Sequence, residues 1–306
     1  MQNVVLLDGG LGQEIYKRAA KTAHPLWSAH IMMENPGLVK AVHQDFIRAG
    51  AQIITLNSYT CTPTRLTRDA DLSWFETLQQ QAVDIATAAR DELGMPVQIA
   101  GCLPPLIGSY AVEKRSKADL KAEYQQIVAQ QEAGVDLFLI ETISNITEAT
   151  AATEAALETG KPVLLSFTIS DREPAKLRSG ESLEDALEAV SGYALSGLLL
   201  NCSLPETISA SLSAIAAYGL PFGGYANGFT SVEALKPGGT VDVLAAREDL
   251  NAAAFASVTS GWVGEGATLV GGCCEVGPAY IAALYNHLVQ KGYYVGPLQQ
   301  QSRSAG

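Results

Sequence analysis

The chain has 306 residues, of which 47% are hydrophobic and 17% charged, and its formal net charge is -12. This length and composition allow a large buried core, whereas the acidic excess argues against a surface for nucleic acid or anionic membranes, because both need clustered Lys and Arg. The sequence contains no basic region followed by the apolar run of a secretory signal, and no apolar run approaches the roughly 20 residues of a membrane span. We therefore expect a cytoplasmic protein with a small-molecule ligand.

Eight short apolar runs predict β-strands, and most lack polar alternation, as parallel strands buried on both faces do. In chain order they are residues 4–7, 52–56, 97–100, 136–140, 163–168, 197–200, 222–225 and 268–270. The clearest helical patterns between them are residues 35–49, 74–93, 117–133, 146–158, 182–193, 207–217 and 247–260. This alternation predicts an α/β fold, a single (β/α)8 TIM-type barrel, with an open doubly wound sheet as the alternative. We expect one domain over residues 1–298 and a disordered tail over 299–306.

Residues that carry chemistry follow the predicted strands, just past the last apolar residue of each. They are Asp8, Asn57, Cys102, Glu141, Cys202, Asn227 and the pair Cys273-Cys274. In a barrel these positions share the C-terminal rim, where the active sites of this fold are built from the βα loops. The sequence therefore predicts that these side chains are neighbours.

Three of the five cysteines are candidate metal ligands. Cys202 follows the sixth predicted strand and Cys273-Cys274 follow the eighth, which brings three thiols to one side of the rim. Three thiolates with an open fourth position suit a catalytic zinc ion. Two adjacent cysteines can face one ion only where the strand ends or bends, which Gly271-Gly272 would permit. The alternatives are buried cysteines that pack as small hydrophobes, or a vicinal disulfide.

The other two cysteines and the histidines carry less signal. Cys61 and Cys102 also lie near the rim and could substitute as ligands, but neither has a paired neighbour, and we interpret them as packing residues. The four histidines lie in the first loop or on predicted helices: His24, His30, His43 and His287. A metal site rich in histidine is therefore not expected.

Together, the motifs along the chain resemble those of a known family, the homocysteine S-methyltransferases, over nearly the whole length of the sequence. The motifs that carry the resemblance are Leu7-Asp8-Gly9-Gly10, Asn57-Ser58-Tyr59, Glu141-Thr142, Ser166-Phe167-Thr168, Asn201-Cys202 and Gly271-Gly272-Cys273-Cys274 followed by Pro278. The segment from Pro25-Leu26-Trp27-Ser28 through Glu34-Asn35-Pro36 to Arg48-Ala49-Gly50-Ala51 resembles the branch that uses S-methylmethionine.

The resemblance implies a role for each part of the rim. The cysteines Cys202, Cys273 and Cys274 would bind zinc, Asp8 and Glu141 would hold the amino group of homocysteine, and the backbone of Gly9 and Gly10 would bind its carboxylate. These roles match the chemical groups of homocysteine. Its thiol suits a soft metal, its ammonium suits acidic side chains, and its carboxylate suits backbone N–H donors. Further substrate-binding residues expected at the rim are Asn57, Tyr59 and Asn227.

The sequence departs from the family's pattern around the mouth of the barrel. The family's acidic Gly-Ser-Glu-Tyr segment corresponds to residues 108–115 here, and its Gly-Pro pair is replaced by Cys102-Leu103-Pro104-Pro105. Glu275-Val276-Gly277 follows the double cysteine, and Tyr280 stands where many members carry His. These departures concern the methyl donor, for which a sulfonium is expected, S-methylmethionine first and S-adenosylmethionine second.

Other functions fit the same predicted barrel. A betaine-dependent homocysteine methyltransferase differs only in the donor. A zinc-dependent hydrolase would use Glu141 or Asp8 as general base, although hydrolytic zinc sites are usually rich in His and carboxylate. A non-catalytic metal or redox sensor would use Cys273-Cys274.

Overall fold

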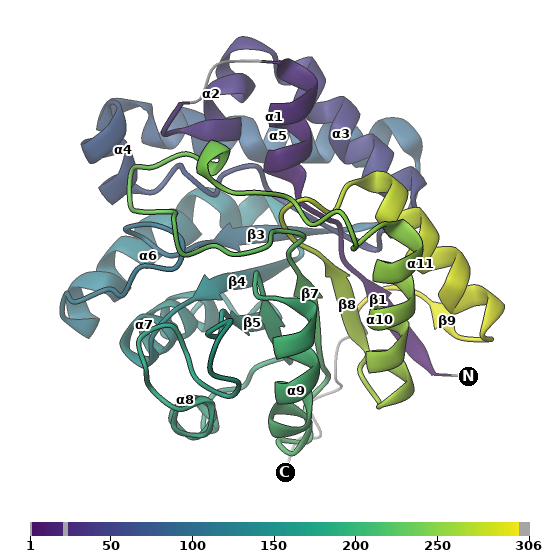
Figure 1. Cartoon of the computed structure of the whole chain (residues 1–306). Coiled ribbons are helices and arrows are strands. Elements are labelled where there is room, and N and C mark those ends of the chain that lie inside the picture. Colours follow the sequence, from purple (N-terminus) through teal and green to yellow (C-terminus); the bar gives the residue numbers. More distant parts are fainter. Residues whose placement is uncertain (1, 21–23, 300–306) are drawn as a thin grey trace.

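The computed structural model describes residues 2–20 and 24–299, and its centre is a curled parallel sheet surrounded by helices (Figure 1). All eight predicted strands are present, and a short ninth follows near the C-terminus. The strands are β1 (Asn3–Leu6), β2 (Ile53–Thr55), β3 (Gln98–Leu103), β4 (Leu137–Ile143), β5 (Val163–Phe167), β6 (Gly197–Asn201), β7 (Phe222–Ala226), β8 (Leu269–Gly272) and β9 (Tyr294–Val295).

Every strand pair is parallel, and the sheet order is β2-β3-β4-β5-β6-β7-β8-β1-β9. The strands from β2 to β8 follow chain order without the reversal that a doubly wound sheet requires, so that alternative is wrong. Residues at the two ends of this series also meet. Leu7 bridges Ile53, and Gln52 N donates a hydrogen bond to Leu6 O at 2.7 Å, which links the end of β1 to β2.

Helices alternate with the strands and cover the outside of the sheet (Figure 1). The α-helices are α1 (Leu11–Ala19), α2 (Trp27–Glu34), α3 (Pro36–Arg48), α4 (Pro63–Asp69), α5 (Phe75–Leu93), α6 (Lys117–Gln131), α7 (Ile146–Leu157), α8 (Leu183–Val190), α9 (Pro205–Ala216), α10 (Ala252–Gly264) and α11 (Pro278–Gln290). Three 3-10 turns are η1 (Leu72–Trp74), η2 (Glu132–Gly134) and η3 (Val241–Val243). The expected helix over 247–260 is wrong at its start, because Asn251 caps α10 and its side chain accepts from Ala253 N and Ala254 N.

The core has two layers, one on each side of the sheet. Val4 and Leu6 of β1 belong to a large cluster shared with the helices, whereas the alternate residues Val5 and Leu7 belong to a smaller one. Each of the strands β1 to β8 contributes at least one side chain to the smaller cluster. Burial on both faces explains why these strands are apolar without alternation.

The carboxyl ends of the strands carry the predicted site residues, with two corrections. Cys102 lies inside β3 and Glu141 inside β4, not past the ends of these strands. The register between β4 and β5 shifts between Ile140 and Ile143, at the position of Glu141. The expected disordered tail falls on residues 300–306, outside the described residues, except for Gln299. Within the described part of the chain, no helix is long and apolar enough to cross a membrane.

Candidate metal and substrate site

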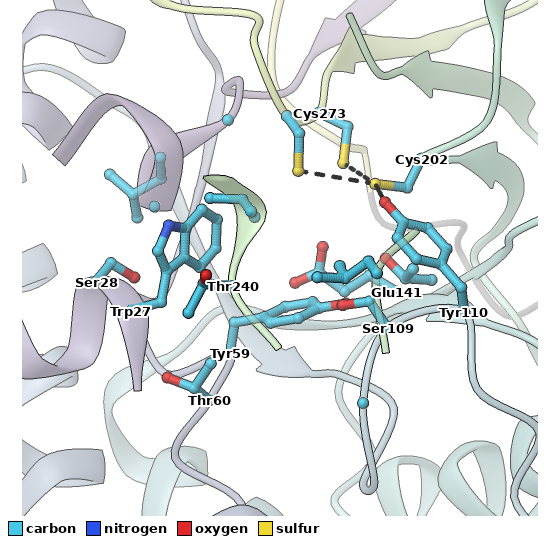
Figure 2. A pocket seen from close by; sticks show the side chains of 18 of the residues that line it. Trp27, Ser28, Tyr59, Thr60, Ser109, Tyr110, Glu141, Cys202, Thr240 and Cys273 are labelled. Atoms are coloured by element: carbon cyan, nitrogen blue, oxygen red, sulfur yellow. Dashed lines mark hydrogen bonds between the residues drawn. The ribbon is translucent and has the colours of Figure 1, made fainter. Parts of the chain in front are cut away.

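Three cysteine side chains meet where β6 and β8 end (Figure 2). The Cys273 thiol donates a hydrogen bond to Cys202 Sγ at 2.8 Å, and the Sγ atoms of Cys202 and Cys274 are 3.9 Å apart. All three sulfurs lie within 4.8 Å of one another, close enough to hold one metal ion. Cys202 is buried, and Cys273 and Cys274 are partly buried. The predicted convergence of the three thiols is therefore present.

A tight turn makes it possible for both adjacent cysteines to face the same point. Strand β8 ends at Gly272, and Val276 N donates to Cys273 O at 3.1 Å across the turn. The left-handed backbone of this turn is at Glu275, with φ 67°. The strand therefore ends directly before the two cysteines, as their common direction requires, and Gly272 permits this ending. Its missing side chain makes room, because a Cβ there would lie 2.1 Å from Val276 Cγ1.

Cys202 also has an unusual backbone, with φ 49° in the left-handed region that non-glycine residues rarely adopt. Its N–H donates to Tyr225 O at 3.1 Å, so the cysteine is joined to β7 directly after β6 ends. Hydrogen bonds from the thiols of Cys273 and Cys274 lower the pKa of Cys202 well below its usual range. The cluster therefore favours a thiolate at Cys202.

Two carboxyl groups line the same cavity as the cysteines, the buried Asp8 and the partly buried Glu141. Asp8 Oδ2 accepts from Thr55 N at 2.8 Å, and Glu141 Oε1 accepts from the Cys102 thiol at 3.1 Å. Burial is the largest cause that raises the pKa of Asp8 to about 8, and the charge of Glu141 raises it further. Burial likewise raises the pKa of Glu141 to about 7. Neither acid has a basic hydrogen-bond partner among the described residues, an arrangement that favours the binding of a cation.

The turn after Asp8 packs directly against the double-cysteine turn. Gly10 N donates to Val276 O at 2.9 Å. A Cβ on Gly9 would lie 2.2 Å from Val276 O, and one on Gly10 would lie 2.5 Å from Cys273 O. Glycine is therefore needed here for close approach, and the acid and thiol halves of the site are joined through backbone contact.

The motif around Asn201 fixes the end of β4 beside Glu141. Asn201 Oδ1 accepts from Thr142 N at 2.9 Å and from Ser166 Oγ at 2.8 Å, and its Nδ2 donates to Thr142 Oγ1 at 2.8 Å. Thr142 has φ 61°, so this network stabilises a second unfavourable backbone conformation at the site.

The remaining predicted residues differ in their placement. Tyr59 lines the cavity, and its hydroxyl is 2.8 Å from Ser109 Oγ. Asn57 also lines it, and its Nδ2 donates to Ser28 O at 3.2 Å. Asn227 is buried but is not among the cavity-lining residues, and its Oδ1 accepts from Phe229 N at 3.1 Å.

A long segment between β7 and α10 lies over the cavity mouth and contributes residues 235–241 and 244 to its lining. Its base is closed by Thr230 N donating to Ala245 O at 2.9 Å and by a bridge between Phe229 and Ala246. Its tip is joined to α1 by the Tyr16 hydroxyl, which donates to Asp242 Oδ1 at 3.0 Å. The sequence analysis missed this segment, although a connection of this length without regular structure is usually functional.

Sequence reasoning also missed residues that complete the cavity wall. Thr55 binds Asp8, and Tyr225 and Trp27 line the cavity with a buried hydroxyl and a buried indole N–H that have no hydrogen-bond partner within the described residues. Tyr225 ends a predicted strand, and a polar aromatic residue at that position is a usable signal. Trp27 belonged to a segment expected to be a loop, where the structure has α2.

A cavity at the carboxyl ends of a parallel sheet, with three thiols on one wall and two acids on another, is typical of the active site of a metal-binding α/β enzyme. Comparison with known proteins identifies which one. A family model described as homocysteine S-methyltransferase matches residues 5–288. The chain belongs to the homocysteine S-methyltransferase family.

Individual relatives agree with this assignment. The chain is 31% identical to homocysteine S-methyltransferase from Escherichia coli (strain K12), covering 92% of this chain and 94% of that protein. It is 29% identical to homocysteine S-methyltransferase 1 from Arabidopsis thaliana, with 94% of each chain covered. The crystal structure of the metallated form of the homocysteine methyltransferase MmuM from Escherichia coli superposes with a TM-score of 0.76 at 29% identity, covering 93% of this chain and 96% of that chain.

Proposed function

We propose that this enzyme transfers a methyl group from a sulfonium donor to the thiol of homocysteine in a zinc-dependent reaction that yields methionine. The observation that carries the proposal is the meeting of three thiols and two acids in one cavity. The thiols suit a soft metal that binds the substrate sulfur, and the acids suit the substrate ammonium. A hydrolase is less well supported, because hydrolytic zinc sites are usually rich in His and carboxylate.

The donor set fits zinc. Zinc–sulfur bonds of roughly 2.3 Å in tetrahedral geometry separate two sulfurs by about 3.8 Å. The Cys202–Cys274 separation of 3.9 Å is close to this value, and the Cys202–Cys273 separation of 2.8 Å is shorter. Three protein ligands leave a fourth position for the substrate. The chemistry that zinc supplies when bound is to keep a thiol deprotonated and nucleophilic near neutral pH.

The acids and the first helix recognise the amino-acid part of homocysteine in this proposal. Asp8 and Glu141 bind the ammonium, whose positive charge lowers their raised pKa values. The carboxylate lies at the turn of Gly9 and at the first N–H groups of α1, where the helix dipole favours an anion. Gly10 N is already bonded to Val276 O, so Gly10 contributes by packing. Asn57 and Tyr59 shape the wall, and Asn227 positions its loop.

The reaction is an in-line displacement at the donor methyl. The bond between the sulfonium sulfur and the methyl carbon breaks, the homocysteine sulfur forms the new bond, and the donor leaves as a neutral thioether. The thiol proton is released to solvent. The residues of this chain orient the acceptor, and the segment over the mouth excludes water from the methyl group. S-methylmethionine is the proposed donor, with S-adenosylmethionine second.

We also propose that the fold is a closed (β/α)8 barrel formed by one domain over residues 1–298. The β1–β2 contact through Leu7 and Ile53 and the inner apolar cluster drawn from all eight strands support this closure.

Methionine formation tests the proposal. Purified enzyme with Zn2+ is given homocysteine and, in separate reactions, S-methylmethionine, S-adenosylmethionine or betaine, and methionine is measured. We expect turnover with a sulfonium and none after removal of the metal. Turnover with betaine alone would overturn the donor, and no methionine with any donor would overturn the reaction. Because one relative is a selenocysteine Se-methyltransferase from Brassica oleracea var. italica, selenocysteine belongs in the acceptor panel.

Metal analysis tests the ligands independently of activity. One zinc per chain is expected for the wild type, and Cys202→Ser, Cys273→Ser and Cys274→Ser should each lose it. The matched controls are Cys61→Ser and Cys102→Ser, which change the other two cysteines and should keep the metal. Zinc lost from the controls but kept in Cys274→Ser would contradict the assignment.

A further inference from the structure

Tyr110 makes direct contact with the thiol cluster. Its hydroxyl is 3.0 Å from Cys202 Sγ, and Figure 2 shows the ring pointing toward that sulfur. Within the described residues, the other hydrogen bonds to the three sulfurs come only from the cysteines themselves. When the cysteine protons are replaced by a metal ion, those thiol hydrogen bonds are lost, and the Tyr110 hydroxyl remains as a donor to Cys202.

The loop that carries Tyr110 is fixed in an unfavourable backbone conformation. Tyr110 has φ 62°, and Cys202, which it contacts, has φ 49°. Such conformations persist in non-glycine residues only where the surroundings determine them. The preceding residue, Ser109, is held by the Tyr59 hydroxyl at 2.8 Å, which fixes the loop from the opposite wall of the cavity (Figure 2).

Arg178 packs over the face of the Tyr110 ring. The guanidinium carbon of Arg178 lies 4.7 Å from the centre of the Tyr110 ring, and its side chain is only 10% exposed. Its Nε donates to Thr168 Oγ1 at 3.0 Å, and its Nη2 contacts Cys202 O at 3.4 Å and Asp171 Oδ2 at 3.1 Å. The Arg178 guanidinium therefore contacts both the ring of Tyr110 and the backbone of Cys202, whose sulfur lies beside the Tyr110 hydroxyl.

We propose that Tyr110 is a positioning residue for the metal centre, donating a hydrogen bond to the Cys202 thiolate while Arg178 orients its ring. This inference rests on the proposed function, because it requires Cys202 to bind a metal as a thiolate. Three thiolates bring more negative charge than one divalent ion neutralises. A hydroxyl that donates to one sulfur stabilises the ionised ligand in a buried site and fixes the direction in which it faces the ion.

The test measures metal binding without turnover. Wild type and Tyr110→Phe, which removes one oxygen and keeps the ring, are titrated with Co2+ as a spectroscopic probe and with Zn2+ against a chelator. Loss of the hydrogen bond should weaken metal binding by roughly 10- to 100-fold, the usual effect of losing an outer-sphere partner. It should also move the thiolate-to-cobalt charge-transfer band to longer wavelength, because the sulfur becomes more electron-rich. Arg178→Lys, which loses the planar contact with the ring, should shift the band by a smaller amount.

The matched control is Tyr193→Phe. Tyr193 also donates its hydroxyl, to Glu154 Oε1 at 2.7 Å, but away from the cavity. This variant should match the wild type in metal affinity and spectrum. A Tyr110→Phe protein with wild-type affinity and an unshifted band would overturn the inference. Failure of the wild type itself to bind one metal per chain would instead overturn the proposed metal site, so the two failures are distinguishable.

Discussion

The thiol of Cys102 donates a hydrogen bond to Oε1 of Glu141 at 3.1 Å, joining the end of β3 to the proposed substrate-binding acid on β4. Cys102 is buried and Glu141 is partly buried, and burial raises the pKa of the Cys102 thiol well above its usual range. The group therefore stays protonated and acts as a donor. The sequence suggested that Cys102 is a packing residue, but its contact with Glu141 gives it a place in the site.

Replacing Cys102 by Ala should weaken homocysteine binding without loss of zinc. The variant leaves Glu141 without its thiol donor, and a hydrogen bond of this kind contributes about 0.5 to 1.5 kcal/mol, which is roughly 2- to 12-fold in KM for homocysteine. Cys102→Ser keeps a donor and should restore most of the affinity. Steady-state kinetics at saturating donor measure the change.

Cys61→Ala is the control for this prediction, because Cys61 is equally buried but, within the described residues, it is the thiol of Cys102 and not that of Cys61 that bonds to Glu141. Its backbone O accepts from Gln79 Nε2, a contact that the substitution retains. An equal rise in KM for both alanine variants would show that lost packing, and not the contact with Glu141, is the cause.

Removing either acid should affect the acceptor more than the metal. Asp8→Asn and Glu141→Gln keep the shape of each side chain but lose the charge that pairs with the ammonium. Loss of a charge-assisted hydrogen bond of about 1.5 to 3 kcal/mol predicts a fall of roughly 10- to 150-fold in kcat/KM for homocysteine. Zinc content and KM for the donor should stay close to wild type. Unchanged dependence on homocysteine in both variants would remove the proposed ammonium role.

The raised pKa of Asp8 also predicts how stability depends on pH. Its pKa changes from 3.8 to about 8 on folding, so the folded chain binds more protons than the unfolded chain between these values. Stability must then fall as pH rises through that window, and Glu141 has the same sign between 4.5 and about 7. Asp8→Asn should therefore gain stability relative to wild type at pH 8 and much less at pH 5. Urea unfolding of the metal-free proteins at both pH values measures this, and an equal difference at the two values would contradict it.

Much of the fold followed from the sequence because parallel strands buried on both faces leave a plain pattern. The predicted strand over 163–168 corresponds to Val163–Phe167, with every residue buried. Elements with weaker patterns were missed. Helices α1 and α2 are only nine and eight residues long, and β9 has two residues. Helix α11 had usable signals in Pro278 at its first turn and in the apolar spacing of Ile281, Leu284 and Leu288.

The sequence predicted which strand ends meet at the site, but it did not predict the contacts between individual side chains there. Convergence of Cys202 with Cys273 requires only a curled parallel sheet whose carboxyl ends share one edge and the position of each cysteine after its strand. The contact between Cys102 and Glu141 depends instead on the local register shift of β4, which no periodicity in the sequence encodes. The contact between Tyr110 and Cys202 depends on two left-handed residues that are neither glycine nor asparagine, and local propensity argues against both.

Gly272→Ala should damage the metal site, although Gly272 binds nothing itself. The new Cβ would lie 2.1 Å from Val276 Cγ1, so the turn that carries Cys273 and Cys274 must move. Overpacking of this kind costs about 1 to 3 kcal/mol of unfolding free energy, and displacement of two ligands should lower zinc affinity as well. Thermal unfolding with and without Zn2+ and a chelator titration measure both effects.

The matched control is Gly261→Ala on α10, where a Cβ meets nothing within 4 Å and the backbone is helical. Alanine should therefore raise the free energy of unfolding by about 0.5 to 1 kcal/mol and leave zinc affinity unchanged. Equal zinc affinity in Gly272→Ala and Gly261→Ala would contradict this prediction. It would show that the packing of Val276 against Gly272 does not determine the direction of the two cysteines.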